Sequence, residues 1–305
     1  MVDVVGFGAL NFDRLFKVER LAKGDTEVHI IDQKGSPGGS AANTIFALGK
    51  LGINCGFVGA IGRDHEGEEL KQDFERVGVD VFKITTLKDV RTGIVVGFVD
   101  KSGERALYVS PGANSELTAE MVDMDYLAAC KIAHLSSFVG DDQFNFQKDV
   151  IESLAGKVKV SLCPGTLYID RGLDQLKPML KKSDFLFMNK AEVEGLTGKE
   201  YPEGSRELLG LGCGTVAITL GGEGSFIIDS EGEYSVPAVA KEAVDTTGAG
   251  DSFAAGFLYG VLLGKSSEQC GMIGNIIASK CVESIGARTN LPTAEEVQSS
   301  ADFPK

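Results

Sequence analysis

AANTIFALGKLGINCGFVGAIGRDHEGEELKQDFERVG, residues 41–78, places two helix patterns on either side of one strand pattern. Apolar residues recur every three or four positions in 41–52 and in 65–78, and both segments end in glycine, a common helix terminus. The short apolar run between them, CGFVGAI (55–61), is typical of a buried strand. Such units predict a mostly parallel sheet that is covered by helices on both faces.

The same alternation continues along most of the chain. Further strand patterns occupy 2–8, 131–137, 158–162, 184–189 and 215–221. A chain of 305 residues with 43% hydrophobic residues is large enough for a substantial core. We therefore predict a single α/β domain covering residues 1–305.

Two segments interrupt this rhythm. TEVHIIDQ (26–33) has no helix of its own, and RTGIVVGFVDKSGERALYVS (91–110) is typical of a hairpin turning at 100–103. We predict that these excursions, at about 14–35 and 91–112, are antiparallel strands that project from the main sheet as a small lid. The alternative is that they are edge strands of the main sheet.

Composition excludes several classes of function. Thirty Lys and Arg against 44 Asp and Glu give a net charge of −14, which disfavours nucleic acid and anionic membranes as partners. The six cysteines and three histidines are too dispersed for a disulfide framework or a zinc pattern. Asp3 stands where a signal peptide would be basic, and the apolar stretch 253–264 is shorter than the roughly 20 residues of a membrane span. We expect a cytoplasmic protein.

Three familiar motifs are absent or incomplete. The segment 6–11, GFGALN, lacks the third glycine of a dinucleotide-binding turn. The segment 260–266, GVLLGKS, resembles a P-loop but has three residues between its glycines instead of four. There is no G-x-S-x-G nucleophile elbow. Dinucleotide chemistry and covalent hydrolysis are therefore disfavoured.

The most informative segment is VDTTGAGDSFAAGF, residues 244–257. A glycine-rich turn runs directly into an apolar helix, so the N–H groups from Gly248 to Asp251 converge at the positive end of the helix dipole and form an anion hole. Asp251 in the first turn can accept a proton from a hydroxyl while these groups hold a transferring phosphoryl. The alternative is an ordinary capped helix.

Polar groups near the N-terminus suit a polyol. Gly38 and Gly39 allow close approach of a ligand to the backbone before a helix, and Asn43 on its first turn can donate and accept hydrogen bonds. Asn11 and Asp13 follow the first strand on the same side of an extended chain.

Two further segments have both functional and structural interpretations. Asn189 and Glu192 can hold a hydrated Mg²⁺ and phosphate oxygens, or can form a helix capping box. TLGGEG (219–224) can accommodate nucleotide phosphate or can be a simple turn.

In order along the chain, GALNFD, GGSAAN, NKAEVEGLTG and DTTGAGDSFAAGF resemble the motifs of the ribokinase-like (PfkB-type) carbohydrate and nucleoside kinase family. The similarity extends over essentially the whole chain. It implies a doubly wound, mostly parallel sheet with a β-strand lid, and ATP-dependent phosphorylation of a hydroxymethyl group with Mg²⁺.

The resemblance also implies a role for each matching position. Asp251 is the expected catalytic base, and Gly248, Ala249 and Gly250 are the expected anion hole. The expected substrate contacts are Asn11, Asp13, Gly38, Gly39 and Asn43. Asn189 and Glu192 are expected in the Mg²⁺ and phosphate network, with Glu192 bound to Mg²⁺ through water. Expected nucleotide contacts are Thr219, Gly221, Gly222, Gly224 and Asn275. Ligands of a monovalent cation such as K⁺ are expected from Asp245, Thr247, Cys281, Ser284, Gly286 and Asn290.

The substrate is left open by departures from ribokinase itself. Ser40 replaces a lysine, and His134 and its neighbours replace an acidic residue. Separately, Cys163 stands where many relatives have an aspartate. We favour a ribose-, fructose- or ketodeoxygluconate-type sugar. The alternatives are an adenosine-, inosine- or cytidine-type nucleoside and, less favoured, a non-catalytic sugar or nucleotide sensor.

Particular side chains bear on these alternatives and on assembly. A nucleobase can stack on phenylalanines 12, 16, 98 and 138, although core packing is the commoner role of phenylalanine. A phosphorylated sugar is disfavoured because few basic residues lie near the lid: Arg14, Lys17, Arg91, Lys101 and Arg105. The unpaired edges of lid strands predict a homodimer.

Overall fold

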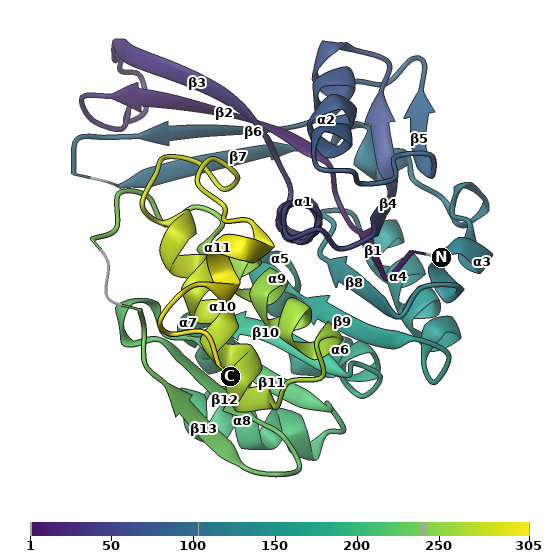
Figure 1. Ribbon diagram of the computed structural model, residues 1–305. Helices are drawn as coiled ribbons and strands as arrows, with labels where there is room; N and C mark the ends of the chain where they lie inside the picture. The colour runs from purple at the N-terminus through teal and green to yellow at the C-terminus, as the bar shows by residue number, and fades with distance from the viewer. Residues whose placement is uncertain (1, 103, 240–241, 305) are drawn as a thin grey trace.

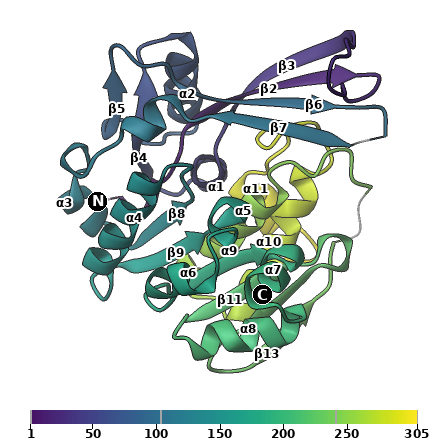
Figure 2. The same ribbon diagram turned by 180° about the vertical axis from the view of Figure 1, so that it is seen from behind.

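The computed structural model describes residues 2–102, 104–239 and 242–304, so Gly103 of the predicted hairpin turn lies outside the described residues. In these ranges the chain forms a nine-stranded sheet, a separate four-stranded sheet and helices around them (Figures 1 and 2). The main sheet has the order β13 (Glu233–Val236), β12 (Ser225–Ile228), β11 (Thr215–Thr219), β10 (Phe185–Asn189), β9 (Lys159–Cys163), β8 (Ile132–Ser136), β1 (Val4–Phe7), β4 (Cys55–Gly62) and β5 (Ile84–Leu87). The smaller sheet has the order β3 (Ile30–Gly38), β2 (Asn11–Val18), β6 (Gly93–Val99) and β7 (Arg105–Ser110).

Helices cover both faces of the main sheet. They are α1 (Ser40–Lys50), α2 (His65–Arg76), α3 (Met124–Ala128), α4 (Asp141–Leu154), α5 (Gly165–Ile169), α6 (Leu173–Leu180), α7 (Lys190–Thr197), α8 (Tyr201–Gly210), α9 (Ala249–Leu262), α10 (Ser267–Cys281) and α11 (Ala294–Gln298). Short 3₁₀ turns are η1 (Gly112–Glu116), η2 (Ala119–Met121) and η3 (Gly221–Glu223).

Two apolar cores lie on opposite sides of the sheet. One joins α1, α9 and α10 through residues such as Ile45, Phe253 and Phe257, and the other joins α4, α6 and α8 to the strands. In the main sheet, the strands β5, β4, β1, β8, β9, β10 and β11 are neighbours in this order and all pair in parallel. The strands β12 and β13 extend the sheet at one edge with antiparallel pairing. The predicted fold class, a doubly wound and mostly parallel sheet flanked by helices, is confirmed.

The smaller sheet differs from the prediction in one respect. The pairs β2–β3 and β6–β7 are antiparallel, but β2 and β6, one from each excursion, pair in parallel from Asn11 and Gly93 to Lys17 and Val99. The prediction of antiparallel strands throughout is therefore wrong at this seam. The cause is geometric, because both strands begin beside the main sheet and run outward in the same direction. The excursions are also not edge strands of the main sheet.

The first excursion begins later than its sequence pattern indicates. Residues 26–29 of the predicted strand are not in strand conformation, and β3 starts at Ile30, where its pairing with Val18 begins. A register irregularity between Lys17 and Val18 ends the regular ladder at that point. Strand propensity alone does not form a strand where no partner is in reach.

His134 on β8 is completely buried in the centre of the main sheet. Its Nδ1 is 2.8 Å from the Ser161 hydroxyl, whereas its Nε2 has no hydrogen-bond partner. Burial lowers the pKa of His134 from 6.5 to about 3. The folded protein therefore holds this imidazole neutral at a pH at which the unfolded chain binds a proton.

This burial predicts a loss of stability in mild acid. As the pH falls from 6.5 toward 3, the unfolding free energy should decrease by up to about 1.4 kcal/mol per pH unit on account of His134. Urea unfolding of the wild type, His134→Leu and the exposed control His65→Gln at pH 7.5, 6 and 5 measures the slope. His134→Leu should have a shallower slope than the other two proteins. Equal slopes in all three proteins would contradict the assignment.

Candidate active site

The glycine-rich turn that leads into α9 has a left-handed backbone that glycine adopts readily. Gly248 is the N-cap residue, with φ of 78° in the left-handed region. A Cβ at this position would lie 2.3 Å from the Cβ of Ala287. Glycine is therefore required here both by conformation and by space, and the helix begins immediately afterward at Ala249.

Asp251 lies in the first turn of α9 and is held by two side chains of α1. Its Oδ1 accepts a hydrogen bond from the Ser40 hydroxyl at 2.7 Å, and its Oδ2 accepts one from Asn43 Nδ2 at 2.9 Å. Burial raises the pKa of Asp251, while these hydrogen bonds and the charge of Arg288 offset part of the increase. The result is an oriented carboxylate with greater affinity for a proton than a carboxylate in water.

The predicted substrate residues come together at the junction of the two sheets. Asn11 is opposite Gly38 and Gly93 in the smaller sheet, and its Oδ1 accepts a hydrogen bond from Asn114 Nδ2 at 3.0 Å. Gly38 leaves room for Asp13, since a Cβ there would lie 2.3 Å from Asp13 Oδ2. These contacts connect the predicted residues of β2 with the glycine pair before α1.

Gly39, the second member of that pair, precedes α1 directly. Its φ of 103° is left-handed, and a Cβ would lie 2.3 Å from the carbonyl oxygen of Ala9. This close approach places the start of α1, with Ser40 and Asn43, against the segment that connects β1 to β2.

Asp13 carries an unused acceptor. Its Oδ1 is buried and has no hydrogen-bond partner in the described structure. Burial is the main cause that raises the pKa of Asp13 from 3.8 to about 6, with Arg288 lowering it and Asp251 raising it. An unpaired buried carboxylate oxygen is costly unless a ligand hydroxyl donates to it.

This cost predicts that Asp13→Asn stabilises the protein at alkaline pH. The pKa is raised on folding, so the wild type loses stability as the pH rises from about 4 through 6, by an amount on the order of 3 kcal/mol. Urea unfolding at pH 8 should favour Asp13→Asn over the wild type, and the difference should shrink at pH 4.5. Asp32→Asn, an exposed change on β3, is the control. An advantage of Asp13→Asn that does not change with pH would contradict this origin.

All of the predicted nucleotide residues line one cavity of about 400 Å³. They are Thr219, Gly221, Gly222, Gly224 and Asn275, and the same cavity includes Ala249 and Gly250 of the anion hole. The Asn275 amide donates to the carbonyl oxygens of Val236 and Pro237 at 3.1 and 3.0 Å, so it also fixes the wall of the cavity at the end of β13.

A smaller cavity of about 120 Å³ contains the carboxylates. Asp251, Asn189 and Glu192 line it, and it shares Thr219 and Gly250 with the larger cavity. The two cavities therefore meet at Thr219 and at Gly250 of the predicted anion hole.

Asn189 and Glu192 also form the capping box that was the structural alternative. Glu192 N donates to Asn189 Oδ1 at 2.9 Å, and Asn189 N donates to Glu192 Oε2 at 2.8 Å. Burial, together with the negative charge of Asp251, raises the pKa of Glu192 despite the bond from Asn189. The capping box uses one carboxylate oxygen, so it orients Glu192 without excluding a ligand at the other.

The predicted cation loops are joined by Asp245. Its Oδ1 accepts from Thr247 N and Oγ1 at 3.0 and 2.7 Å, and its Oδ2 accepts from Gly286 N at 2.9 Å. Burial alone would raise the pKa of Asp245, but these bonds outweigh burial and lower it. The Cys281 thiol lies 3.5 Å from the Thr247 carbonyl oxygen, and Ser284 follows Cys281 in the loop that contains Gly286. Asp245 thus connects the turn before α9 to the loop after α10.

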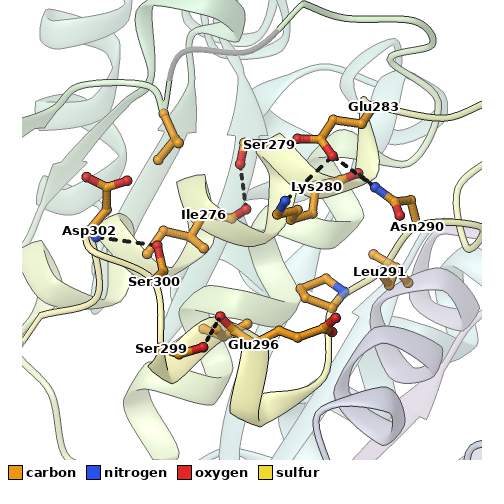
Figure 3. Close-up of a pocket in the computed structure, with 13 residues that line it drawn as sticks. Ile276, Ser279, Lys280, Glu283, Asn290, Leu291, Glu296, Ser299, Ser300 and Asp302 are labelled. Atoms are coloured by element: carbon orange, nitrogen blue, oxygen red, sulfur yellow. Dashed lines mark hydrogen bonds and ion pairs between the residues drawn. The ribbon is translucent and has the colours of Figure 1, made fainter.

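Asn290 lines the cavity of Figure 3. Its Nδ2 donates to the Lys280 carbonyl and to Glu283 at 3.0 and 3.1 Å. This cavity, of about 440 Å³, adjoins the nucleotide cavity through Val239 and Ser279 and contains none of the predicted catalytic residues.

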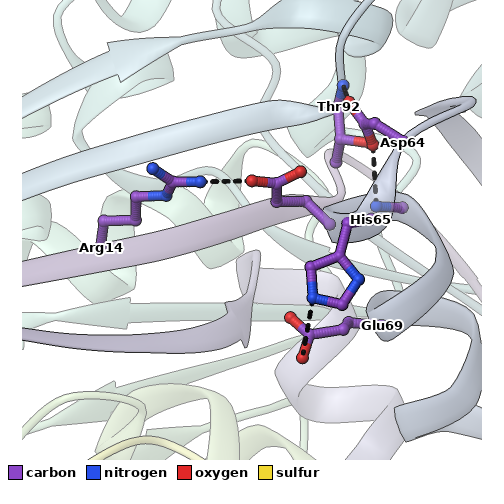
Figure 4. A network of polar contacts seen from close by, with 7 residues as sticks. Arg14, Asp64, His65, Glu69 and Thr92 are labelled. Carbon is purple, nitrogen blue, oxygen red and sulfur yellow. Dashed lines mark hydrogen bonds and ion pairs between the residues drawn. The ribbon is translucent and has the colours of Figure 1, made fainter.

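Polar contacts anchor the smaller sheet to α2 (Figure 4). Asp64 caps α2 through Gly67 N at 3.0 Å and also accepts from Thr92 N at 2.8 Å, just before β6. Arg14 on β2 forms an ion pair with Glu66 on α2. Both excursions are therefore tied to the same helix.

The smaller sheet also reaches the loops around the anion hole. Lys34 Nζ donates to the Ile285 carbonyl at 3.1 Å, and Arg105 Nη1 lies 3.5 Å from Thr247 Oγ1. Strands from both excursions thus contact the loops that Asp245 joins.

The phenylalanines considered for base stacking are not placed for that role. Side chains alternate along β2, so Phe12 and Phe16 face away from the side of Asn11 and Asp13. Phe16 instead stacks on Phe98 with ring centroids 5.3 Å apart. Phe138 is buried against Phe7 at 5.5 Å. The alternative role in packing is therefore the observed one.

Two residues of the site were missed as candidates from the sequence. Ser40 was noted only as a departure from ribokinases, yet it donates directly to Asp251. Arg288 had no motif at all, and its Nε donates to Asn43 Oδ1 at 2.9 Å. Cys163, which stands where many relatives have an aspartate, lies in the wall of the smaller cavity. Burial raises the pKa of its thiol.

Within residues 2–102, 104–239 and 242–304, no helix combines the length and apolar content that a bilayer span requires. Residues 1–294 match the family model described as pfkB family carbohydrate kinase. An uncharacterized sugar kinase of Archaeoglobus fulgidus is 40% identical over 80% of this chain and 98% of that protein. An ATP-dependent ribose-1-phosphate kinase of Halopiger xanaduensis is 33% identical over 97% of both chains. The crystal structure of the nucleoside kinase of Methanocaldococcus jannaschii is similar with a TM-score of 0.84, at 28% identity over 97% of both chains.

Proposed function

The chain belongs to the pfkB family of carbohydrate kinases, and we propose that this ATP-dependent sugar or nucleoside kinase uses Asp251 as its catalytic base. The observation that carries the proposal is the position of Asp251. Asp251 lines the smaller cavity next to Gly250, which both cavities share, and it accepts a hydrogen bond from Asn43 of α1.

The proposed reaction transfers the γ-phosphoryl group to a hydroxymethyl group. Asp251 accepts the hydroxyl proton as the oxygen bonds to the γ-phosphorus and the bond to the β-phosphate oxygen breaks, which releases ADP. The N–H groups of Gly248 and Gly250 stabilise the charge on the transferring group, with Ala249 N–H, which also donates to the Thr246 carbonyl at 3.2 Å, between them. Asn11, Asp13 and Asn43 orient the acceptor, with Asp13 Oδ1 taking a hydrogen bond from a substrate hydroxyl. Gly38 and Gly39 give the substrate room, and the nucleotide lies along Thr219, Gly221, Gly222, Gly224 and Asn275.

We propose that Mg²⁺ is held beside Glu192 and Asn189. No cluster of three or more His, Cys, Asp or Glu residues suited to a metal occurs among the described residues. The one carboxylate of Glu192 and the amide of Asn189 fit Mg²⁺, because this ion keeps several waters and binds phosphate oxygens with only one or two carboxylates. A cation would also lower the raised pKa of Glu192. When bound, Mg²⁺ neutralises charge on the β- and γ-phosphates.

A K⁺-type ion is proposed behind the anion hole, at Asp245 and Thr247 and at the carbonyls of Cys281, Ser284 and Gly286. The Asp245 carboxylate already joins the two loops through three donors, which supports a compact site. Asn290 contributes to the end of the same loop through Lys280 and Glu283.

The preferred acceptor is an unphosphorylated sugar of ribose, fructose or ketodeoxygluconate type. A nucleoside is the second candidate because an apolar pocket adjoins Asn11. Val109, Val139 and Leu167 expose apolar surface there, whereas Phe138 is buried against Phe7 and offers little surface. Such a surface suits the flat face of a base, although the pocket is only about 70 Å³.

A coupled ADP-release screen tests the proposal. The acceptors are ribose, fructose, ketodeoxygluconate, adenosine, inosine, cytidine and ribose 1-phosphate, each with ATP and Mg²⁺ and with or without K⁺. Acceptor-dependent ADP release by the wild type, absent in Asp251→Asn, supports a kinase with this base. Binding of an acceptor without turnover would favour the sensor alternative and overturn the proposal.

We further propose a cytoplasmic homodimer that forms through the smaller sheet, which acts as a lid over the acceptor. The face of that sheet opposite Asp13 carries Phe16, Phe98 and the exposed Tyr108. Apolar side chains on an open sheet support association with a second copy. Sedimentation at several protein concentrations measures this state.

A further inference from the structure

Arg288 is a buried cation at the centre of the site. It lies in the loop between α10 and α11, and its side chain is only 8% exposed. Its Nε donates to Asn43 Oδ1 at 2.9 Å, and its Nη1 donates to Asp73 Oδ2 at 2.7 Å. Its Nη2 lies 3.5 Å from the Gly38 carbonyl oxygen. One side chain thus connects the end of β3, α1 and α2.

The guanidinium is also fixed in orientation by aromatic rings. Its Cζ lies 5.1 Å from the ring centre of Phe46 and 5.4 Å from that of Phe74. Planar packing of this kind leaves the guanidinium little freedom to rotate. The direction of each N–H group is therefore set by the fold.

The charge of Arg288 is shared among several carboxylates. Asp73 is the direct partner. The Asp13 carboxylate packs against Gly38, whose carbonyl oxygen lies 3.5 Å from Arg288 Nη2, and Asp251 is bonded to the same Asn43 amide that Arg288 contacts. The charge of Arg288 lowers the pKa of both Asp13 and Asp251 against the effect of burial. Burial of a charge is expensive unless it is paired, so a cation placed among these groups offsets part of the cost of burying them.

We propose that Arg288 is a positioning residue for the phosphoryl transfer: it fixes the direction of the Asn43 amide toward Asp251 and supplies the counter-charge of the buried Asp13. The inference rests on the proposed function, in which Asp251 is the base and Asp13 contacts the acceptor. Because Arg288 Nε occupies Asn43 Oδ1, the Nδ2 of that amide is directed at Asp251 Oδ2. Without the guanidinium, the amide is free to turn its oxygen toward the carboxylate, where two acceptors would repel.

Other titratable groups face Asp251 and Asp13, and their number decides which of the two carboxylates reports best on Arg288. Asp251 also faces Glu192 of α7, Cys163 of β9 and Cys281 of α10. Asp13 on β2 faces Arg288 and Asp251. Asp13 is therefore the cleaner reporter of the charge at Arg288.

The test separates charge from orientation with two substitutions. Arg288→Met removes both, whereas Arg288→Lys keeps the charge and loses the fork that contacts Asn43 and Asp73 together. Arg76→Met is the matched control, since Arg76 also pairs with Asp73, at 3.5 Å, but is exposed. Carboxyl ¹³C NMR titration of aspartate-labelled protein, assigned with Asp13→Asn, reports Asp13 without any substrate.

We expect the Asp13 pKa to rise by about one unit in Arg288→Met and to stay near the wild-type value in Arg288→Lys and Arg76→Met. With an acceptor from the ADP-release screen, kcat should fall about 100-fold in both Arg288 variants and remain unchanged in Arg76→Met. An unchanged Asp13 titration in folded Arg288→Met, or wild-type kcat in Arg288→Lys, would overturn the corresponding half of the inference.

A second variant covers the case in which Arg288→Met does not fold. Asp73→Asn leaves Arg288 in place without its direct partner, so the Asp13 pKa should move below its wild-type value. A rise in that pKa, or no change, would overturn the electrostatic role. If no acceptor gives turnover, the proposed function fails, but the NMR titration still decides the role of Arg288.

Discussion

Asp251→Asn is expected to lower kcat by about 1,000-fold, the range in which loss of a general base falls. The variant keeps the shape of the side chain, and its Oδ1 and Nδ2 can still pair with Asn43 and the rotatable Ser40 hydroxyl. Replacing a buried carboxylate by an amide also removes the cost of burying its charge, so the thermal midpoint should not fall. ADP-release rates at saturating ATP and acceptor measure the effect.

A matched control makes this result specific. Asp174→Asn changes an exposed aspartate in the first turn of α6 and should leave kcat unchanged. ATP binding, followed by calorimetry, should be similar in the wild type and in Asp251→Asn. Near-normal turnover by Asp251→Asn would eliminate Asp251 as the base.

Gly248→Ala should have the second-largest effect, about 100-fold on kcat with a stability loss of about 3 kcal/mol. A left-handed φ of 78° strains any L-residue, and the added methyl would lie 2.3 Å from the Cβ and 2.7 Å from the Cα of Ala287. The turn or the loop of Ala287 must therefore move, and the N–H groups of the anion hole move with it. Urea unfolding and kcat measure the two consequences separately.

Two companion variants identify the cause. Ala287→Gly in the Gly248→Ala background removes the collision with the Ala287 Cβ but neither the 2.7 Å approach to its Cα nor the strain in φ, so part of the stability and activity should return. Gly250→Ala places its methyl where no heavy atom lies within 4 Å, although Gly250 lines both cavities. It should keep normal stability while weakening ATP binding. Equal stability of the wild type and Gly248→Ala would contradict the steric account.

Local chemistry explains what the sequence predicted well. The turn GAGD before α9 combines a glycine-dependent φ at Gly248 with an acidic first turn, and both properties depend on neighbouring residues only. The α/β class likewise follows from the alternation of short apolar runs and helix patterns. The nucleotide residues from Thr219 to Gly224 share one loop, so their convergence required little long-range information.

Long-range packing explains what the sequence did not reveal. Arg288 lies 245 positions from Asn43, 215 from Asp73 and 250 from Gly38, and no local motif identifies it. The parallel pairing of β2 with β6 depends on where two distant excursions leave the main sheet.

The parallel seam between β2 and β6 has a consequence for the way this protein can be cut and recombined. A hairpin can be removed or transplanted as one continuous insert, but two parallel neighbours must come from separate pieces of chain. The four-stranded sheet enters and leaves the main body twice, before and after α1, β4 and α2. Deletion of residues 91–112 would expose the β2 edge that β6 covers, and a graft of the sheet onto another scaffold would need two insertion points. The smaller sheet is therefore exchangeable only when both of its chain segments are moved together.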